Sequence, residues 1–540
     1  MLDNTNAVAS TAIKTVPEPS STESIVVEST IAKPIVWTLA GSDSGGGAGI
    51  QADLHTFKAL DCHGCSVISC ITSQNSLGIT AYTNVSLALF ISQLNCLIAD
   101  MPPKVIKIGL IADPEQLIAL TQWIGKNKYQ FNFKVIADPV FSSSTGYDFA
   151  KQELVLAWQQ LLPLIDLITP NYPELAILSQ AKLITDKASW QSQQNTSTLE
   201  QQAKALLAQG VKAVLVTGGH DQSSNKVTDT LYRSRQAAFT VHNKRINTKH
   251  NHGTGCVLSS SISAALAHDY TVEDALIIGN ACIQQGLAKA YATGKGAGCL
   301  SLDTWPKNRE YFPQLRAICG KTQLQPYSPM QTPIGLYPVL DSCEWLALLA
   351  PHGLDTVQLR IKQDSKIKAS ETEIEQQIIA AVNLAKKYHL RLFINDYWQL
   401  AIKHGAYGVH LGQEDLLTAD LVAINQVGLR LGISTHSYQE VLNAIELKPS
   451  YIALGHIYPT TTKDMPSKPQ GLEKLKRYKQ LCHPIPTVAI GGINATRLPQ
   501  VLECQVDGVA VVTAITAQQE PTQAFIALKK LFSQYFQKQF

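Results

Sequence analysis

Residues 391–415 read RLFINDYWQLAIKHGAYGVHLGQED. A mostly apolar run, Arg391–Asn395, is followed by a stretch of helical length and then by a second short apolar run, Gly408–Leu411. Short apolar runs bounded by polar residues read as buried strands, and strands that alternate with helices pair in parallel. This stretch therefore predicts one unit of a parallel α/β fold.

The same rhythm extends through residues 333–540. Six further apolar runs, separated by helical segments, lie at Gly335–Leu340, Val357–Ile361, Arg430–Ile433, Tyr451–Gly455, Thr487–Ile490 and Gly508–Val512. Eight βα units in about 200 residues predict a (β/α)₈ TIM barrel, whose chemistry lies at the carboxyl ends of the strands.

Polar residues follow nearly every one of these strands. They are Arg360 and Lys362, Asn395 and Asp396, Gln413 and Asp415, Ser434 and His436, Thr460, Thr462 and Lys463, Gly491 and Gly492, and Thr513. Two carboxylates, Asp396 and Asp415, suit Mg²⁺, which prefers oxygen ligands and substrate phosphates. Cations beside a metal and glycines after the seventh strand predict a site for a diphosphate and a separate phosphate. The alternative is a rim of solvated ion pairs.

The motifs themselves resemble those of the thiamine-phosphate synthase family. They are Gly335-Leu-Tyr-Pro-Val, Gln358-Leu-Arg-Ile-Lys362, Phe393-Ile-Asn-Asp396, Gly408-Val-His-Leu-Gly-Gln-Glu-Asp415, Pro459-Thr-Thr-Thr-Lys463 and Ala489-Ile-Gly-Gly-Ile493. The resemblance implies coupling of a hydroxymethylpyrimidine diphosphate to a thiazole phosphate, with release of pyrophosphate.

The same resemblance implies roles for individual residues. Asp396 and Asp415 hold Mg²⁺, and Arg360 and Lys463 act in catalysis. The pyrimidine diphosphate is bound by Gln358, Leu359, Arg360, Ile361, Lys362, Asn395, Ser434 and Lys463. The thiazole phosphate is bound by Thr460, Thr461, Thr462, Gly492, Val512 and Thr513; the family commonly has Ser at the position of Thr513.

Residues 34–320 form a second α/β region. Candidate strands are Val36–Ala40, Ser66–Thr72, Val105–Ile111, Lys134–Ala137, Leu167–Thr169 and Ala213–Val216, with a hairpin at 229–246 and helices starting near Gly253 and Thr271. The alternation with helices predicts a mostly parallel sheet covered on both faces.

Two glycine clusters mark this region, at 41–49 and at 253–256. Glycines at a helix start leave backbone N–H groups pointing at one place, which is an anion site. The first cluster lacks the Lys of a P-loop, so an ordinary P-loop is rejected. Each cluster alone is a structural turn about as often as a ligand site.

Together with other motifs, the clusters resemble hydroxymethylpyrimidine phosphate kinase of the ribokinase-like superfamily. The motifs are the segment 38–53, Gln74-Asn75, Lys107-Ile-Gly109, Asp138-Pro-Val140, Thr169-Pro-Asn-Tyr-Pro-Glu174, Gly218-Gly-His220 and His252-Gly-Thr-Gly-Cys256. The resemblance implies an α/β sandwich that phosphorylates hydroxymethylpyrimidine and its monophosphate with ATP and Mg²⁺.

In this reading Cys256 is the catalytic base, and a helix N-terminus is expected to lower the pKa of its thiol. Gly253 and Gly255 form the anion hole. The resemblance places the pyrimidine at Gly41, Asp53, Gln74 and Val140, and the nucleotide phosphates and Mg²⁺ near Asp138, Glu174 and Thr254. The alternative for Cys256 is a small apolar thiol that seals the helix start.

Three departures from the kinase pattern leave alternatives open. Thr217 and His55 stand where the family usually has Lys, and Asn251 where it usually has Thr. A non-catalytic pyrimidine-binding module in front of an active synthase is one alternative. A pyridoxal-type specificity of the kinase is another.

Composition sets the remaining bounds. The 540 residues are 16% charged with a net charge of +3, which predicts small-molecule substrates and neither a nucleic-acid nor a membrane partner. Eleven scattered cysteines and the lack of a signal-peptide pattern favour a cytoplasmic protein. Buried thiols are favoured over a metal at Cys62 and Cys65. Residues 1–33 read as a disordered tail and 321–332 as an exposed linker; a homo-oligomer stays open by analogy.

Overall fold

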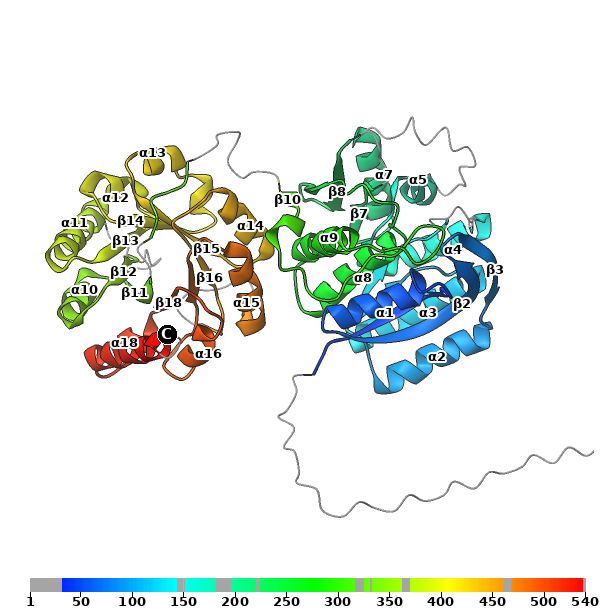
Figure 1. The fold of residues 1–540 in the computed structure, drawn as a ribbon, viewed down its shortest axis with the longest axis horizontal. Helices are drawn as coiled ribbons and strands as arrows, with labels where there is room; N and C mark the ends of the chain where they lie inside the picture. The colour runs from blue at the N-terminus through cyan, green and yellow to red at the C-terminus, as the bar shows by residue number, and fades with distance from the viewer. Residues whose placement is uncertain are drawn as a thin grey trace, which may run out of the picture. The chain divides into compact units, whose positions relative to one another are not determined.

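The computed structural model describes residues 32–142, 149, 151–180, 196–219, 224–315, 325–330, 333–361, 370–460 and 468–537. Within them lie a ten-stranded sheet flanked by helices and a closed eight-stranded barrel (Figure 1). The α/β class predicted for both regions is confirmed.

The first region is built on a sheet with the strand order β10-β9-β8-β7-β6-β5-β4-β1-β2-β3. The central strands β7, β6, β5, β4, β1 and β2 are parallel to one another. The antiparallel strands β8, β9 and β10 extend one edge of the sheet, and the antiparallel strand β3 forms the other. The strands are β1 Ile35–Ser42, β2 His63–Asn75, β3 Gly78–Asn84, β4 Val105–Ile108, β5 Lys134–Ala137, β6 Leu167–Ile168, β7 Ala213–Val216, β8 Lys226–Arg233, β9 Phe239–Lys244 and β10 Gln314–Leu315.

Helices cover both faces of this sheet because its central strands are apolar on both sides. On β1, Val36 belongs to one core with α1 (Gly49–Ala59), α8 (Thr254–Ala267) and α9 (Val272–Ala288). Its neighbour Trp37 belongs to a second core on the other face. That face is covered by α2 Leu87–Asp100, α3 Pro114–Phe131, α4 Gln152–Leu161, α5 Tyr172–Gln180 and α7 Thr196–Ala208.

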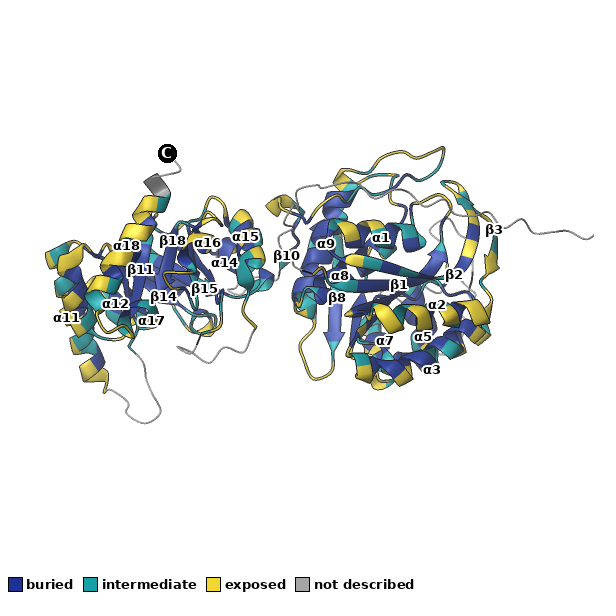
Figure 2. Cartoon of the chain, turned by 90° about the horizontal axis from the view of Figure 1, so that it is seen from below, coloured by how far each residue is buried: buried dark blue, intermediate teal, exposed yellow. Residues whose placement is uncertain are grey.

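The second region is a closed parallel barrel. Its strands are β11 Gly335–Leu340, β12 Thr356–Leu359, β13 Arg391–Asn395, β14 Gly408–Leu411, β15 Arg430–Thr435, β16 Tyr451–Gly455, β17 Thr487–Ile490 and β18 Gly508–Val511, and β18 pairs back onto β11. The surrounding helices are α10 Cys343–Leu349, α11 Glu371–Tyr388, α12 Trp398–His404, α13 Leu421–Gln426, α14 Tyr438–Glu446, α15 Gly471–Cys482, α16 Leu498–Leu502, α17 Thr513–Thr516 and α18 Pro521–Gln537. Their buried stripes face the strands, and α11 and α18 expose their outer faces (Figure 2).

All eight predicted barrel strands and the six predicted parallel strands are present. The predicted hairpin is also present, but it begins earlier, at Lys226. The edge strands β3 and β10 are missed by the sequence reasoning. Four of the seven residues of β3 are exposed, so this strand has no continuous apolar run to reveal it.

The described part of the predicted linker, 325–330, is only partly exposed. Tyr327 and Met330 are only 4% and 7% exposed. The Tyr327 hydroxyl donates to the carbonyl of Leu421, and the carbonyl of Pro329 accepts from Arg430. The side chains of Tyr327 and Met330 pack into the apolar cores of the barrel, whereas Gln325, Pro326 and Pro329 are exposed. Residues 321–324 and 331–332 lie outside the described residues, as do 1–31 of the predicted tail.

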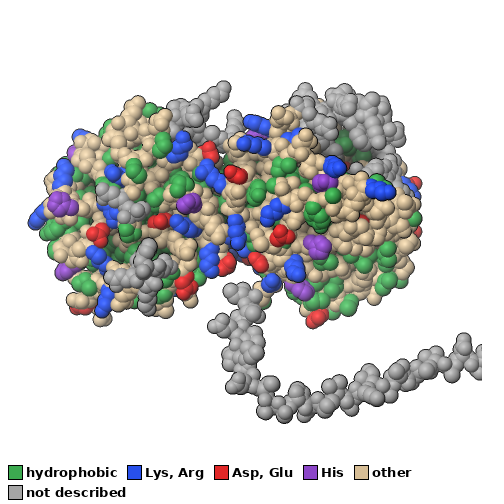
Figure 3. Space-filling view, in the orientation of Figure 1, with side chains coloured by type: hydrophobic (Ala, Val, Ile, Leu, Met, Phe, Trp, Pro, Cys, Tyr) green, Lys and Arg blue, Asp and Glu red, His purple; other side chains and the backbone are tan. Residues whose placement is uncertain are grey.

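In the described part of the chain, no helix is both long and apolar enough to span a membrane. On the face seen in Figure 3, Lys and Arg side chains are interspersed with Asp and Glu side chains.

Candidate active sites

The first glycine cluster forms a loop between β1 and α1 that wraps around the carboxylate of Asp43. The backbone N–H of Gly45 donates to Oδ1 at 2.7 Å, and those of Gly47 and Ala48 donate to Oδ2 at 3.1 and 2.9 Å. Burial acts to raise the pKa of Asp43, but its hydrogen bonds with His252 and these amides outweigh that effect and lower the pKa. A buried, ionised side chain therefore holds the loop in shape.

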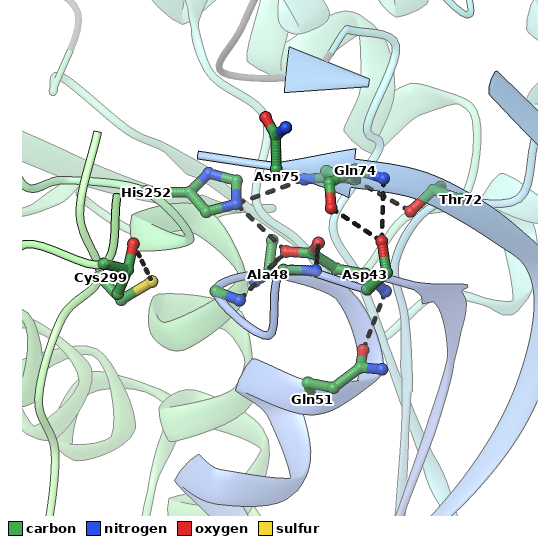
Figure 4. A network of polar contacts seen from close by, with 12 residues as sticks. Asp43, Ala48, Gln51, Thr72, Gln74, Asn75, His252 and Cys299 are labelled. Carbon is green, nitrogen blue, oxygen red and sulfur yellow. Dashed lines mark hydrogen bonds and ion pairs between the residues drawn. The ribbon is translucent and has the colours of Figure 1, made fainter. Parts of the chain in front are cut away.

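Asp43 also reaches the second glycine cluster. Its Oδ2 lies 3.2 Å from Nε2 of His252, and the side-chain amide of Gln74 lies 3.3 Å from the same nitrogen. Figure 4 shows Asp43, Gln74 and His252 pointing toward one another from the loop after β1, from β2 and from the loop before α8. The predicted pyrimidine contact Gln74 is thus joined to the predicted anion hole.

The anion hole begins at Gly253, the residue that precedes α8. Its φ of +82° is a left-handed conformation that glycine adopts readily. A Cβ there would lie 2.0 Å from the carbonyl oxygen of Gly47, so the two glycine clusters are in direct contact. Thr254 turns inward to its own loop, where its hydroxyl donates to the carbonyl of Asn251 at 2.6 Å.

Asp53 lies in a buried ion pair beneath this hole. Its carboxylate is 2.8 Å from Nζ of Lys107 and also accepts from the hydroxyls of Thr38 and Ser260, at 2.5 and 2.6 Å. Asp53 and Lys107 are both fully buried. Because four donor contacts already occupy its oxygens, Asp53 is placed to hold β1, β4 and α8 together, and its predicted contact with the pyrimidine remains untested.

Cys256 differs from the expectation for a helix start. Burial raises the pKa of its thiol to about 12; Lys107 and the N–H of Gly49 act to lower it, while Asp53 and Asp138 act to raise it. The predicted lowering is therefore wrong, because desolvation and the carboxylates of Asp53 and Asp138 outweigh Lys107 and the N–H of Gly49.

Asp138, directly after β5, and Glu174, in α5, form an acidic pair. Burial raises the pKa of both, and the charge of Asp138 raises that of Glu174 further. Asp138 accepts from Thr169 and Ser259 at 3.2 and 3.3 Å, and a Cβ on Gly255 would lie 3.5 Å from its Oδ2. Two buried carboxylates that repel each other beside an anion hole suit a divalent cation bound together with phosphates.

The other predicted pyrimidine contacts lie at strand ends of the same sheet. Gly41 is close-packed at the end of β1, where a Cβ would lie 2.8 Å from the sulfur of Cys70. The amide of Val140, just after β5, donates to the carbonyl of Asp138. His220 lies outside the described residues, and Thr217 donates its amide hydrogen to the carbonyl of Pro170.

In the barrel, the predicted pyrimidine side chains Gln358 and Ser434 are joined by a chain of buried hydrogen bonds. The Gln358 amide donates to the hydroxyl of Tyr337 at 3.3 Å, which lies 2.8 Å from the hydroxyl of Tyr451. His410 then connects Tyr451, at 2.7 Å from Nδ1, to Ser434, at 2.8 Å from Nε2. Both ends of the predicted pyrimidine site are therefore fixed from inside the barrel.

The residues predicted to hold the diphosphate and Mg²⁺ follow β12, β13 and β14. Arg360 and Ile361 come directly after β12, Asn395 is buried at the end of β13, and Asp396 after it is exposed with a φ of +66°. Asp415 accepts from the amide of Gly412 at 3.2 Å. Among the described residues no three His, Cys, Asp or Glu side chains are grouped to hold a metal. Two carboxylates fit Mg²⁺ that is completed by substrate phosphates.

The predicted thiazole-phosphate end is shaped by glycines. Gly492 has a φ of +62°, and a Cβ there would lie 2.4 Å from the carbonyl oxygen of Pro459, the residue before Thr460. Val512 precedes α17, and Thr513 is its first residue. Thr461, Thr462, Lys463 and Lys362 lie outside the described residues.

The sequence reasoning assigned no role to several residues of these networks. They are Asp43, Lys107 and His252 in the first region and Tyr337, His410 and Tyr451 in the barrel. Each stands inside or beside an apolar strand or a glycine cluster, and a polar residue in such a run is the signal that could have found it.

Comparisons with known proteins agree with the two regions. Residues 43–301 match the family described as phosphomethylpyrimidine kinase, and residues 336–515 match the family described as thiamine monophosphate synthase. The chain is 59% identical over 191 residues to the thiamine-phosphate synthase of Serratia proteamaculans strain 568, covering 35% of this chain and 88% of that protein. The corresponding protein of Proteus mirabilis strain HI4320 is 57% identical over 205 residues, covering 38% of this chain and 93% of that protein.

Solved structures resemble the first region. The phosphomethylpyrimidine kinase of Clostridium difficile 630 is 32% identical, covers 46% of this chain and 96% of its own, and has a TM-score of 0.38. The pyridoxal kinase of Staphylococcus aureus in complex with ADP is 23% identical, covers 53% and 98%, and has a TM-score of 0.45. The chain belongs to the thiamine-phosphate synthase family through its barrel, and the region in front of the barrel is a phosphomethylpyrimidine kinase domain.

Proposed function

We propose that both domains of this bifunctional enzyme are active and catalyse consecutive steps of thiamine biosynthesis. The kinase domain phosphorylates 4-amino-5-hydroxymethyl-2-methylpyrimidine and then its monophosphate with ATP. The barrel couples the resulting diphosphate to 4-methyl-5-(2-phosphoethyl)thiazole and releases pyrophosphate. The observation that carries the proposal is that one chain contains a kinase domain and a synthase domain, and the product of the first is the substrate of the second.

In the kinase reaction the substrate oxygen forms a bond to the γ-phosphorus of ATP while the bond to ADP breaks, and the hydroxyl proton passes to Cys256. The backbone N–H groups at Gly253 and Gly255 stabilise the transferred phosphoryl group. Asp138 and Glu174 would hold Mg²⁺, which supplies positive charge to the phosphates when bound.

Burial and two carboxylates raise the pKa of Cys256 to about 12, which keeps its thiol neutral at neutral pH. The carboxylate of Asp138 contributes to that high value. Positive charge bound at this carboxylate removes part of the repulsion and makes the thiolate easier to form. The base role of Cys256 therefore belongs to the loaded site.

In the synthase reaction the C–O bond to the diphosphate breaks, pyrophosphate leaves with the bonding electrons, and the thiazole nitrogen forms the new bond to carbon. The step needs stabilisation of the leaving group more than proton transfer. Arg360, Lys362, Asn395 and Lys463 bind the diphosphate, and Asp396 and Asp415 would hold Mg²⁺, which neutralises it. Gln358 and Ser434 orient the pyrimidine.

The test is a time course with purified protein, hydroxymethylpyrimidine, ATP, Mg²⁺ and thiazole phosphate. Successive monophosphate, diphosphate and thiamine phosphate support two active domains. If thiamine phosphate forms only when ready-made diphosphate is supplied, the first domain is a non-catalytic pyrimidine-binding module. Thr217, at a position where the family usually has Lys, favours this alternative. Comparing kcat/KM for hydroxymethylpyrimidine and pyridoxal tests the pyridoxal-type alternative.

A cytoplasmic location is also part of the proposal. The ten described cysteines are free thiols, which suits a reducing compartment. Fractionation of cells that express the full chain tests it.

A further inference from the structure

The Asp43 carboxylate is the centre of an unusually complete set of hydrogen bonds. It accepts from three backbone amides of its own loop and lies 3.2 Å from Nε2 of His252, 209 residues away in sequence. The side chains of Asp43 and His252 are only 3% and 7% exposed. A contact between two such buried side chains fixes the positions of both loops that carry them.

The contact also determines where the hydrogens lie. An ionised carboxylate only accepts, so Nε2 of His252 carries a hydrogen directed at Asp43. The atom of Gln74 that lies 3.3 Å from this nitrogen must then be the amide oxygen, and the other amide atom, 3.2 Å from the Thr72 hydroxyl oxygen, must be the nitrogen. Thr72 accepts this N–H because its own hydrogen is donated to the carbonyl of Ser42. His252 therefore sets the orientation of the Gln74 amide.

Backbone contacts link the same two loops next to this pair. A Cβ on Gly47 would lie 2.5 Å from Cδ2 of His252, and one on Gly253 would lie 2.0 Å from the carbonyl oxygen of Gly47. Gly49, at the end of the same loop, lies near enough to Cys256 that its N–H acts to lower the pKa of the thiol. A shift of the glycine loop would therefore move Gln74, the anion hole and Cys256 relative to one another.

Part of the glycine loop borders open space. Gly46 and Gly47 line a cavity of about 430 Å³ together with His55, Tyr291 and Cys299. Ser44 also ties the loop to β2 at the backbone of Gln74, at 2.7 and 2.9 Å, whereas Asp43 and His252 make the side-chain contact to the second glycine cluster.

We propose that Asp43 and His252 are positioning residues for phosphoryl transfer. Their contact, which we call the latch, holds the glycine loop against the anion hole and fixes the Gln74 amide toward the pyrimidine. This inference rests on the kinase activity proposed above. Neither residue transfers a proton to the substrate; they act through Gln74 and through the amides at Gly253 and Gly255.

The test compares Asp43→Asn, His252→Ala, His252→Gln and the double variant Asp43→Asn/His252→Ala in the full-length protein. Asp100→Asn and His63→Ala, two exposed positions outside the network, are matched controls. Kinase kcat, the KM for hydroxymethylpyrimidine and the KM for ATP are measured, together with synthase activity on supplied diphosphate. Wild-type kinase turnover is required first, and its absence would contradict the proposed function rather than the latch.

Asp43→Asn and His252→Ala are expected to lower kcat about 10- to 100-fold and to raise the KM for the pyrimidine. The KM for ATP and the synthase rate stay at wild-type values. His252→Gln recovers activity because its amide nitrogen still donates to Asp43, and the double variant is no worse than the poorer single one.

Three results overturn the latch. In the first, the kinase kcat values of Asp43→Asn and His252→Ala equal those of the two control variants. Another is a double variant whose losses multiply, which would show independent residues. The third is a parallel loss of ATP binding and of the kinase domain's thermal transition, which would assign the pair to fold maintenance.

Discussion

Nζ of Lys107 lies 2.8 and 3.0 Å from the two carboxylate oxygens of Asp53, and neither side chain is exposed. Burial acts to lower the pKa of Lys107, but the charges of Asp53 and Asp138 and the hydrogen bond with Asp53 outweigh it and raise the pKa. Lys107 is therefore charged inside the kinase domain, where it faces the carboxylate of Asp53.

Removing one partner leaves an uncompensated charge in the core. Lys107→Met or Asp53→Asn is expected to destabilise the kinase domain by about 3–5 kcal/mol, whereas the double variant is less destabilised than either single one. Urea unfolding of the kinase domain, followed beside synthase activity, measures this. If Asp53→Asn instead leaves stability intact and raises only the KM for the pyrimidine, Asp53 is a ligand contact and not a core ion pair.

The pKa of Cys256 predicts a pH dependence. A base with a free-enzyme pKa of about 12 is deprotonated in a larger fraction at each step toward alkaline pH. With ATP and Mg²⁺ subsaturating, so that the free enzyme is titrated, the kinase kcat/KM should therefore rise about tenfold per pH unit from pH 6.5 to 9 without a plateau. Cys256→Ser, whose hydroxyl does not ionise in this range, should lose both the rate and the slope and keep synthase activity. A plateau below pH 8 in the wild type contradicts a raised pKa.

The sequence predicts the parallel strands well because each is buried on both faces. Arg391–Asn395 and Lys134–Ala137 are seen as apolar runs for this reason, whereas the half-exposed β3 is not. The glycine clusters are also visible, because spacing along the chain reveals them. The contact between Asp43 and His252 is not visible, since it joins positions 209 residues apart and no local pattern records such a pair.

Desolvation is the other quantity that local patterns miss. A helix start beside Cys256 suggests a lowered pKa, but the opposite direction follows from the carboxylates of Asp53 and Asp138, which come from other elements. The burial of Tyr327 in the predicted linker is missed for a related reason, since its hydroxyl meets the carbonyl of Leu421 only in the folded barrel.

The hydrogen-bond chain inside the barrel predicts an effect of a single hydroxyl. Tyr451→Phe removes the bonds to Tyr337 and to Nδ1 of His410, so the side chain that positions Ser434 loses its support. We expect a drop of about tenfold in synthase kcat/KM for the pyrimidine diphosphate and a stability loss of about 1–3 kcal/mol. Kinase activity in the same protein should stay unchanged.

Tyr407→Phe is the matched control for this change. The Tyr407 hydroxyl is buried beside Phe393 and has no hydrogen-bond partner within the described ranges. Its removal should leave the synthase rate unchanged and stability equal or higher. Equal losses in both variants would show that the barrel core tolerates neither deletion and that the chain from Tyr451 to Ser434 has no special role.

Gly492 and Gly471 separate backbone strain from steric clash. Both have φ values near +70°, at +62° and +71°, but only at Gly492 would a Cβ meet another atom, 2.4 Å from the carbonyl of Pro459. Gly492→Ala should raise the KM for thiazole phosphate at least tenfold, because the loop before Thr460 must move. Gly471→Ala should cost about 1 kcal/mol of stability and leave that KM unchanged. Indistinguishable KM values in steady-state assays would exclude Gly492 from the phosphate site.

Asp396 offers the sharpest test of the metal site in the barrel. Its φ of +66° is a conformation that Asp and Asn both tolerate, so Asp396→Asn changes the charge while keeping the backbone. If Asp396 holds Mg²⁺, the variant should need at least tenfold more Mg²⁺ for half-maximal synthase activity and should recover when Mg²⁺ is raised. Glu414, the exposed neighbour of Asp415, serves as control. Glu414→Gln should leave the Mg²⁺ dependence of the synthase unaltered. Titration of the synthase rate with Mg²⁺ checks this, and an activity loss that no Mg²⁺ concentration changes would mean that Asp396 acts on the substrate and not on a metal.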